Sequence, residues 1–283
     1  MVMYEVIIVN EKELERKKKE IAQDGAEKLH ILSDFDRTIT YGLADGKKTP
    51  TVISQLRSDP KYLGEDYSKR ANELFDVYHP IEIDSKISLT KKKKEMDDWW
   101  MKHFNLIAEY NLTKELIKKV VREKPLRFRK GSLKFLTLLN NKNVPLIFMS
   151  AAPGDMLIEY LSQNKLLLLN ISVISNLYEW DKDGKAIQIK KPVVTSVNKD
   201  ETLIHKFPIY DKIKNRKNVL LLGDGLEDVG MIEGFDYKNL IKIAFLNENV
   251  EENLPAFKKV YDVILLGDPD MSYVNKLVKE ILK

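Results

Sequence analysis

The chain has 283 residues, 43% of them hydrophobic, which is enough to bury a sizeable core and excludes a disordered protein. Lys and Arg number 47 against 43 Asp and Glu, and a formal net charge of +4 is too small for this length to indicate nucleic-acid binding. The chain contains no cysteine, which excludes disulfides, thiolate catalysis and cysteine-ligated metal sites and is typical of a reducing compartment.

The N-terminal part of the chain predicts one helix and one buried strand. Residues 1–10 include a short apolar run, but no basic residue precedes it and a charged stretch follows at once, so we predict no signal peptide. No window approaches the roughly 20 apolar residues of a membrane-spanning helix. We therefore expect a cytoplasmic protein without a membrane partner. Residues 11–26 predict a helix that ends near Gly25, and residues 29–32 predict a strand that leads directly into Asp34.

The character of the sequence changes between residues 42 and 129. Charged amphipathic segments follow one another there, with almost no β-like runs, and they predict helices. These segments lie at residues 65–78, 90–110 and 113–122. Because this helical block comes after the first strand of an α/β pattern, we expect an inserted cap domain, residues 42–129. It is a candidate lid for a core formed by residues 1–41 and 130–283.

After Gly131 the chain alternates between helical and strand-like segments. Helices are predicted at residues 132–140 and 156–163, and apolar strands at residues 145–149, 171–174, 219–222, 241–246 and 263–266. A turn at Asp183-Gly184 predicts a small hairpin within residues 178–189. Strands that alternate with helices predict a parallel sheet covered on both faces, which is the α/β, Rossmann-like class.

Acidic and polar residues follow several of the predicted strands. They occur in the segments Asp34-Phe-Asp36-Arg-Thr38, Ser150-Ala-Ala-Pro-Gly-Asp155 and Gly223-Asp-Gly-Leu-Glu-Asp228, with Asn198-Lys199-Asp200 between the second and third. Open α/β sheets bind ligands at the carboxyl ends of their strands. We therefore expect these segments to form one site.

The residue types at this site are suited to phosphoryl transfer. An aspartate such as Asp34 is ionised at neutral pH and can attack phosphorus, which divides hydrolysis into two steps. Its repulsion with the phosphate has to be cancelled, and Mg²⁺ bound by oxygen ligands does this. We expect Asp34, Asp36, Asp224 and Asp228 to form the metal site, with one direct and one water-mediated ligand from the last two.

The remaining polar residues of the site have separate predicted roles. Asp36 lies where it can protonate the leaving alkoxide and then activate the hydrolytic water. Ser150 and Thr38 are predicted to donate hydrogen bonds to the phosphate. Lys199 is predicted to place a fixed positive charge on the transferring group, an effect that grows when water is excluded.

The motifs resemble those of a known superfamily. Asp-Phe-Asp-Arg-Thr at residues 34–38 resembles the Asp-x-Asp-x-Thr motif of haloacid dehalogenase phosphatases, and Ser150, Lys199 and the pair Asp224 and Asp228 resemble its later motifs in order. From about Gly25 onward the chain resembles the cytosolic pyrimidine 5′-nucleotidase (5′-nucleotidase III) family. The supporting stretches are residues 78–84, 96–100, 148–155, 173–176 and 241–247.

The resemblance implies a haloacid dehalogenase-type fold with an inserted cap, Mg²⁺ as the cofactor and a nucleoside monophosphate as the substrate. A pyrimidine nucleotide such as UMP or CMP is implied, as is 7-methylguanosine monophosphate. The family's base-contacting glutamate, in a Met-x-Glu-Trp-aromatic stretch, corresponds to Asp98. Trp100 takes the aromatic position at the end of that stretch. Family members that also accept 7-methylguanosine monophosphate carry tryptophan there, and tryptophan would stack on a cationic base. Ala151, beside Ser150, is implied to bind substrate.

Other interpretations of these residues stay open. Trp100 and His103 can pack inside the cap, and the lysines of residues 91–94 can form a solvated helix face in place of a nucleic-acid patch. One alternative function is a phosphatase for another small ester, such as phosphoserine. Another is a non-catalytic binding protein on the same fold, for RNA through the lysines. We expect a small-molecule substrate, no nucleic-acid partner and a monomer.

Overall fold

The structure is a computed structural model that describes residues 5–44, 46–84 and 86–283, with residues 201 and 202 described by their backbone alone. The prediction for residues 1–10 therefore falls partly outside the described residues. Among the helices described, none is both long enough and apolar enough to cross a membrane.

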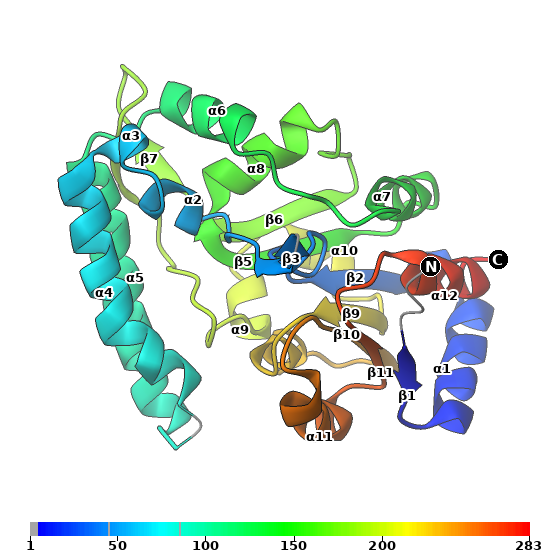
Figure 1. Ribbon diagram of the computed structural model, residues 1–283. Coiled ribbons are helices and arrows are strands. Elements are labelled where there is room, and N and C mark those ends of the chain that lie inside the picture. The colour runs from blue at the N-terminus through cyan, green and yellow to red at the C-terminus, as the bar shows by residue number, and fades with distance from the viewer. Residues whose placement is uncertain (1–4, 45, 85) are drawn as a thin grey trace.

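A seven-stranded sheet lies at the centre of the molecule (Figure 1), in the order β1-β11-β10-β9-β2-β5-β6. Its strands are β1 (Val6–Ile8), β2 (Leu29–Ser33), β5 (Leu146–Pro153), β6 (Ile171–Asn176), β9 (Asn218–Gly223), β10 (Asn239–Leu246) and β11 (Val263–Leu266). Every neighbouring pair is parallel except β1 with β11, which confirms the predicted parallel sheet. The edge strand β1 was not predicted, because three residues carry too short a pattern.

Helices cover both faces of the sheet, as Figure 1 shows. One face packs against α1 (Glu11–Asp24), α7 (Ser132–Asn141), α8 (Gly154–Gln163) and α12 (Ser272–Ile281), and the other against α9 (Glu201–Ile204), α10 (Ile209–Ile213) and α11 (Val250–Val260). Short 3₁₀ helices lie at η1 (Ala26–Lys28) and η2 (Glu227–Ile232). Successive side chains alternate between the faces, so that Ile31 belongs to the first hydrophobic cluster and Leu32 to the second. Both are fully buried, as expected for a parallel sheet.

The first predicted helix has clear local signals. The side chain of Asn10 accepts a hydrogen bond from the amide of Glu13, which caps the N-terminus of α1. Gly25 ends the helix with φ of 84°, a left-handed conformation that favours glycine. The chain then passes through η1 into β2, at whose end the acidic motif begins.

The block predicted to be helical contains α2 (Ser54–Arg57), α3 (Pro60–Leu63), α4 (Glu65–Ile83), α5 (Leu89–Glu109) and α6 (Lys114–Glu123), together with two strands of two residues each, β3 (Leu43–Ala44) and β4 (Lys47–Lys48). The long helices α4 and α5 pack against each other and stand beside the sheet in Figure 1. In contrast, α6 packs on α8. The start and the end of this helical block lie side by side: the amide of Tyr41 donates a hydrogen bond to the carbonyl of Arg127 at 2.9 Å.

The predicted hairpin is confirmed as β7 (Tyr178–Trp180) and β8 (Ala186–Ile189). It contacts α5: the Tyr178 hydroxyl donates to the carbonyl of Phe104, and the two rings meet edge to face at 5.9 Å. The same hydrophobic cluster includes Trp100 of α5 and Phe148 of the sheet. Residues 42–129 therefore share a continuous apolar interior with the rest of the chain.

Candidate active site at the carboxyl ends of the central strands

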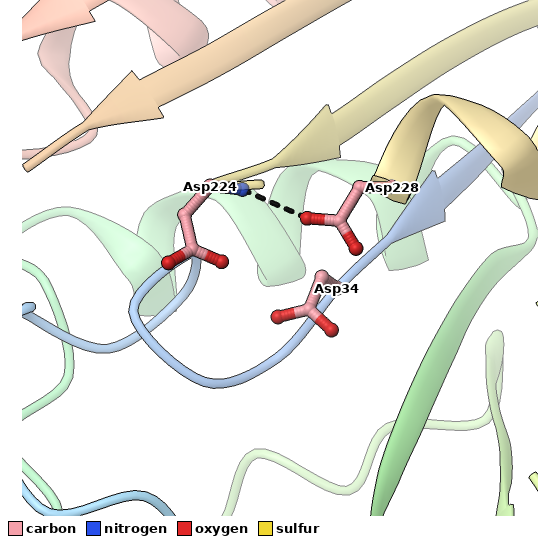
Figure 2. A group of neighbouring side chains, drawn as sticks. All are labelled: Asp34, Asp224 and Asp228. Atoms are coloured by element: carbon pink, nitrogen blue, oxygen red, sulfur yellow. Dashed lines mark hydrogen bonds between the residues drawn. The ribbon is translucent and has the colours of Figure 1, made fainter. Parts of the chain in front are cut away.

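Three aspartates meet where β2 and β9 end. Asp34 directly follows β2, and its amide donates to the carbonyl of Leu222 in β9 at 3.0 Å. Asp224 directly follows β9, and Asp228 lies in η2. Figure 2 shows the three aspartates grouped at this edge of the sheet, and one oxygen from each lies within 4.8 Å of the others.

The loop that carries Asp224 is held by Asp228. One carboxylate oxygen of Asp228 accepts from the amides of Asp224 and Gly225, each at 3.0 Å, and the first of these bonds is drawn in Figure 2. A Cβ at Gly223 would lie 2.5 Å from the Cβ of Asp228, so only glycine allows this approach. The hydroxyl of Tyr261 donates to the carbonyl of Gly225. These contacts leave the carboxylate of Asp224 facing the other acids.

Lys199 is the positive charge at this site. Its ammonium donates to Asp34 at 2.5 Å and to Asp228 at 3.2 Å, and its side chain is 7% exposed. Burial disfavours the charged form, but the two carboxylates outweigh that effect and raise the pKa of Lys199. The predicted motif in residues 198–200 is thus brought to the acidic cluster.

The site holds more negative than positive charge. Burial raises the pKa of Asp34 to about 8, with Lys199 opposing and Asp228 adding to the rise. Burial, and then the neighbouring Asp34 and Asp228, raise the pKa of Asp224 well above its usual value. A divalent cation among the three would remove this repulsion, and a set of oxygen donors suits a hard ion such as Mg²⁺. The residues therefore fit the predicted metal.

The carboxylate of Asp36 does not join this acidic group. It accepts a hydrogen bond from the amide of Val52, at the start of the inserted block, at 3.0 Å. Burial raises the pKa of Asp36 to about 6, and the bond from Val52 opposes the rise. A carboxyl group with that pKa exchanges a proton near neutral pH, as a general acid must. The structure therefore separates Asp36 from the three acids that the sequence assigned with it to the metal.

Thr38 lies at the base of the same loop. Its hydroxyl is fully buried and finds no hydrogen-bond partner within the described part of the chain. Buried hydroxyls are normally paired, so the unpaired hydroxyl of Thr38, four residues after Asp34, is an exception in this loop.

Ser150 lies inside β5, not after the strand as predicted. Strand β5 continues to Pro153, but its pairing with β6 is interrupted between Met149 and Pro153. Side chains replace the missing ladder: the Asn176 amide donates to the carbonyl of Ala151 at 2.7 Å. The Ser150 oxygen accepts from the amide of Ala152 at 3.2 Å, which leaves its hydrogen free to donate.

The cap residues predicted to bind the base point in different directions. Asp98 receives hydrogen bonds from Tyr78 and, at 2.7 Å, from Lys102, and its side chain is 47% exposed. Hydrogen bonds from Lys102 and then Tyr78 lower the pKa of Asp98. Trp100 is 7% exposed and packs on Phe104, with ring centroids 5.5 Å apart. Because Phe104 contacts the β7 hairpin, Trp100 lies on the side of α5 that faces the core.

Glu82 is a residue that the sequence interpretation missed. It lies near the end of α4, and its carboxylate accepts from the hydroxyl of Ser196 at 2.7 Å. Ser196 is three residues before Lys199, so Glu82 reaches from the cap to the segment that carries the lysine. Residues 78–84 are one of the stretches that resemble the family, and Glu82 is one of the two acids in that stretch.

Comparisons with known proteins agree with this geometry. The family model described as pyrimidine 5′-nucleotidase (UMPH-1) matches residues 37–282. The 7-methylguanosine phosphate-specific 5′-nucleotidase A of Xenopus laevis is 34% identical over 267 residues, which cover 94% of this chain and 92% of that protein.

Solved structures give the same result. Cytosolic 5′-nucleotidase IIIB bound to cytidine superposes with a TM-score of 0.89 and 26% identity, covering 98% of this chain and 93% of that one. A haloacid dehalogenase family hydrolase from Salmonella enterica shares the fold, with a TM-score of 0.55, 14% identity and coverage of 91% and 73%. The predicted fold class is therefore confirmed, and the chain belongs to the pyrimidine 5′-nucleotidase (UMPH-1) family.

Proposed function

We propose that this protein is a Mg²⁺-dependent 5′-nucleotidase that hydrolyses nucleoside 5′-monophosphates with Asp34 as the nucleophile. The observation that carries the proposal is the contact of Asp34 with Lys199 beside Asp224 and Asp228, at the carboxyl ends of adjacent parallel strands. Membership of a nucleotidase family supports the leaving group, which is a nucleoside 5′ oxygen.

The reaction proceeds in two steps. The carboxylate of Asp34 attacks phosphorus, and an aspartyl-phosphate forms while the bond to the ribose 5′ oxygen breaks. Asp36 donates its proton to that oxygen and then accepts one from the attacking water. Lys199, Ser150 and the unpaired hydroxyl of Thr38 donate to the phosphate oxygens.

Mg²⁺ bound by Asp34 and Asp224 would neutralise the charge between carboxylates and phosphate. Asp228 is suited to contact the ion through water, because both of its oxygens already accept hydrogen bonds. We therefore propose that Asp224 binds the ion directly, that Asp228 binds it through water and that Asp36 transfers protons.

The inserted block, residues 42–129, is proposed to hold the nucleobase and to close over the phosphate. Trp100 lies on the core-facing side of α5, and Glu82 reaches the core from α4. Asp98 instead pairs with Tyr78 and Lys102 within the inserted block, whereas the Glu82 carboxylate contacts His79 and also Ser196, near Lys199. A pyrimidine or 7-methylguanine base is supported by the names of the relatives, and tryptophan stacks well on a cationic base.

The cellular setting follows from the same relatives. Proteins of similar sequence and structure are named cytosolic 5′-nucleotidases, which supports a cytosolic location for this chain. We propose a monomer as the oligomeric state.

A phosphate-release screen tests the proposal. Wild type should release phosphate from UMP, CMP or 7-methyl-GMP with added Mg²⁺, and more slowly from phosphoserine. Asp34→Asn should lose at least about 10⁴-fold in kcat, because the nucleophile is removed. Asp211→Asn, an exposed acid paired with Lys214 on α10, is the matched control and should keep full activity.

Two results would contradict the proposal. Full activity of Asp34→Asn would exclude the nucleophile, and a preference for phosphoserine over every nucleotide would favour the small-ester phosphatase. A protein that binds nucleotides or RNA without phosphate release would be the non-catalytic alternative.

A further inference from the structure

Arg129 has a role that the sequence motifs do not assign. Its side chain is among the largest that are fully buried, and its guanidinium pairs with Asp268 at 2.7 Å. A guanidinium has five N–H donors, and five contacts surround this one. Besides Asp268, they are the carbonyls of Thr38 (2.9 Å), Arg37 (2.5 Å) and Pro269 (2.5 Å) and the side-chain oxygen of Asn247 (2.8 Å).

Two of these contacts hold the nucleophile loop. Arg37 and Thr38 belong to the turn that begins with Asp34, and Arg129 donates to both of their carbonyls. Arg37 adopts φ of 60°, a left-handed conformation that is unfavourable for a residue with a side chain. The loop therefore needs an external constraint to keep this shape, and the guanidinium supplies it.

Through Asp268, the ion pair with Arg129 also contacts the inserted block. The two oxygens of Asp268 accept from the amides of Gly42 and Leu43, each at 2.8 Å, where the chain leaves the core. Arg129 itself stands where the chain returns, and its amide donates to the carbonyl of Ile39 at 2.9 Å. The ion pair thus contacts the nucleophile loop and both connections between core and cap.

Stability alone is a poor explanation for this pair. A buried ion pair contributes little net stability, since apolar residues of similar volume often do as well. The planar fork of arginine instead fixes the direction of several carbonyls at once, which a lysine cannot do.

We infer that the Arg129–Asp268 pair is a positioning device that sets the geometry of the Asp34 loop and links it to the two connections of the cap. The inference rests on the proposed function for the identity of the nucleophile and of the reaction. Arg129 and Asp268 touch no reacting atom; they act through the loop backbone.

The test compares Arg129→Lys and Asp268→Asn with wild type on two substrates, a nucleoside monophosphate and p-nitrophenyl phosphate. Arg129→Lys keeps the positive charge but loses the planar guanidinium group and its several donors. The kcat should therefore fall about 10- to 100-fold on both substrates, with KM nearly unchanged. Asp268→Asn should lower kcat on both and, by loosening the contact to Gly42 and Leu43, raise KM for the nucleotide only.

A control separates positioning from stability. Lys17→Met removes another ion pair, with Asp262 at 2.8 Å, between α1 and the sheet. It should lower the thermal midpoint without changing kcat or KM. Wild-type kcat in Arg129→Lys on p-nitrophenyl phosphate would overturn the inference, whatever the change in midpoint.

Beryllofluoride with Mg²⁺ provides a second measurement, because it mimics the phosphoryl group on an aspartate. It should raise the thermal midpoint of wild type and raise that of Arg129→Lys less. Wild type that hydrolyses p-nitrophenyl phosphate but no nucleotide would contradict the proposed function and leave the positioning test intact. If beryllofluoride raised the thermal midpoints of wild type and Arg129→Lys equally, the positioning role would be contradicted. If wild type hydrolysed neither substrate and its thermal midpoint did not rise with beryllofluoride, both proposals would be contradicted.

Discussion

Lys199 is the residue on which the balance of charge at the site depends. Four carboxylates, at Asp34, Asp36, Asp224 and Asp228, surround the end of the sheet, and Lys199 is the cation that contacts two of them. A buried cation in this place lowers the repulsion among the acids, and in the proposed reaction it would stabilise the transferring phosphate.

Lys199→Met should lower kcat about 10²- to 10³-fold, the cost of removing one fixed charge from a site that excludes water. The same change should lower the thermal midpoint more in EDTA than in Mg²⁺, because the acids then lack both Lys199 and the metal ion. Kinetics and thermal unfolding check both parts. Lys214→Met, on the surface at α10, is the matched control, and equal losses in the two variants would exclude a specific role for Lys199.

At the scale of elements, α4 and α5 present two acids to different surroundings. Glu82 at the end of α4 contacts Ser196 of the core, while Asp98 on α5 is paired within the cap by Tyr78 and Lys102. Residues two apart on a helix lie on different faces, so Asp98 cannot share the core-facing side with Trp100.

In the proposed function Glu82 contacts the nucleobase. Glu82→Gln should therefore raise KM for a nucleoside monophosphate about tenfold, the loss of affinity expected when one charge-assisted hydrogen bond to the base is weakened. The KM for p-nitrophenyl phosphate, which has no base, should stay unchanged. Asp98→Asn is the paired control and should leave both KM values near wild type. A larger effect of Asp98→Asn on the nucleotide would restore the assignment made from the sequence.

At the scale of the whole molecule, we expect Mg²⁺ binding to raise the free energy of unfolding. Mg²⁺ at about 100 times its Kd should raise the free energy of unfolding by about 2.7 kcal/mol, because the three acids converge only in the folded state. Thermal unfolding with Mg²⁺ and with EDTA measures the difference. Asp224→Asn should lose the stabilisation, whereas Asp211→Asn should keep it. A Mg²⁺ effect that persists in Asp224→Asn would place the ion elsewhere.

Two buried histidines predict how stability depends on pH. Burial lowers the pKa values of His30 and His103 from 6.5 to about 3. Below pH 6.5 the unfolded chain binds a proton at each position that the folded chain does not, so stability is lost as the pH falls from 6.5 toward 3. Between pH 7 and pH 5 each histidine should cost about 2 kcal/mol.

Urea unfolding at the two pH values checks this expectation. His103→Gln should show a smaller drop between pH 7 and pH 5 than wild type, by about the amount expected for one histidine. The prediction fails if His103→Gln and wild type have the same pH dependence.

Much of the core could be predicted because local patterns and global topology agree. The apolar run before Asp34, the alternation after Gly131 and the Asp183-Gly184 turn each correspond to an observed element. Ser150 was placed after its strand, because a sequence pattern cannot show that Asn176 replaces the strand ladder there.

The sequence by itself determined the class of fold and the acids that meet where β2 and β9 end, because strand periodicity and motif order are local properties. Only the tertiary structure decided that Asp36 turns to Val52, that Glu82 and not Asp98 contacts Ser196 near Lys199, and that Arg129 donates to the carbonyl of Arg37 in the turn after Asp34. These contacts join residues far apart in the chain, and their direction depends on how the cap packs on the sheet. No local pattern encodes that packing.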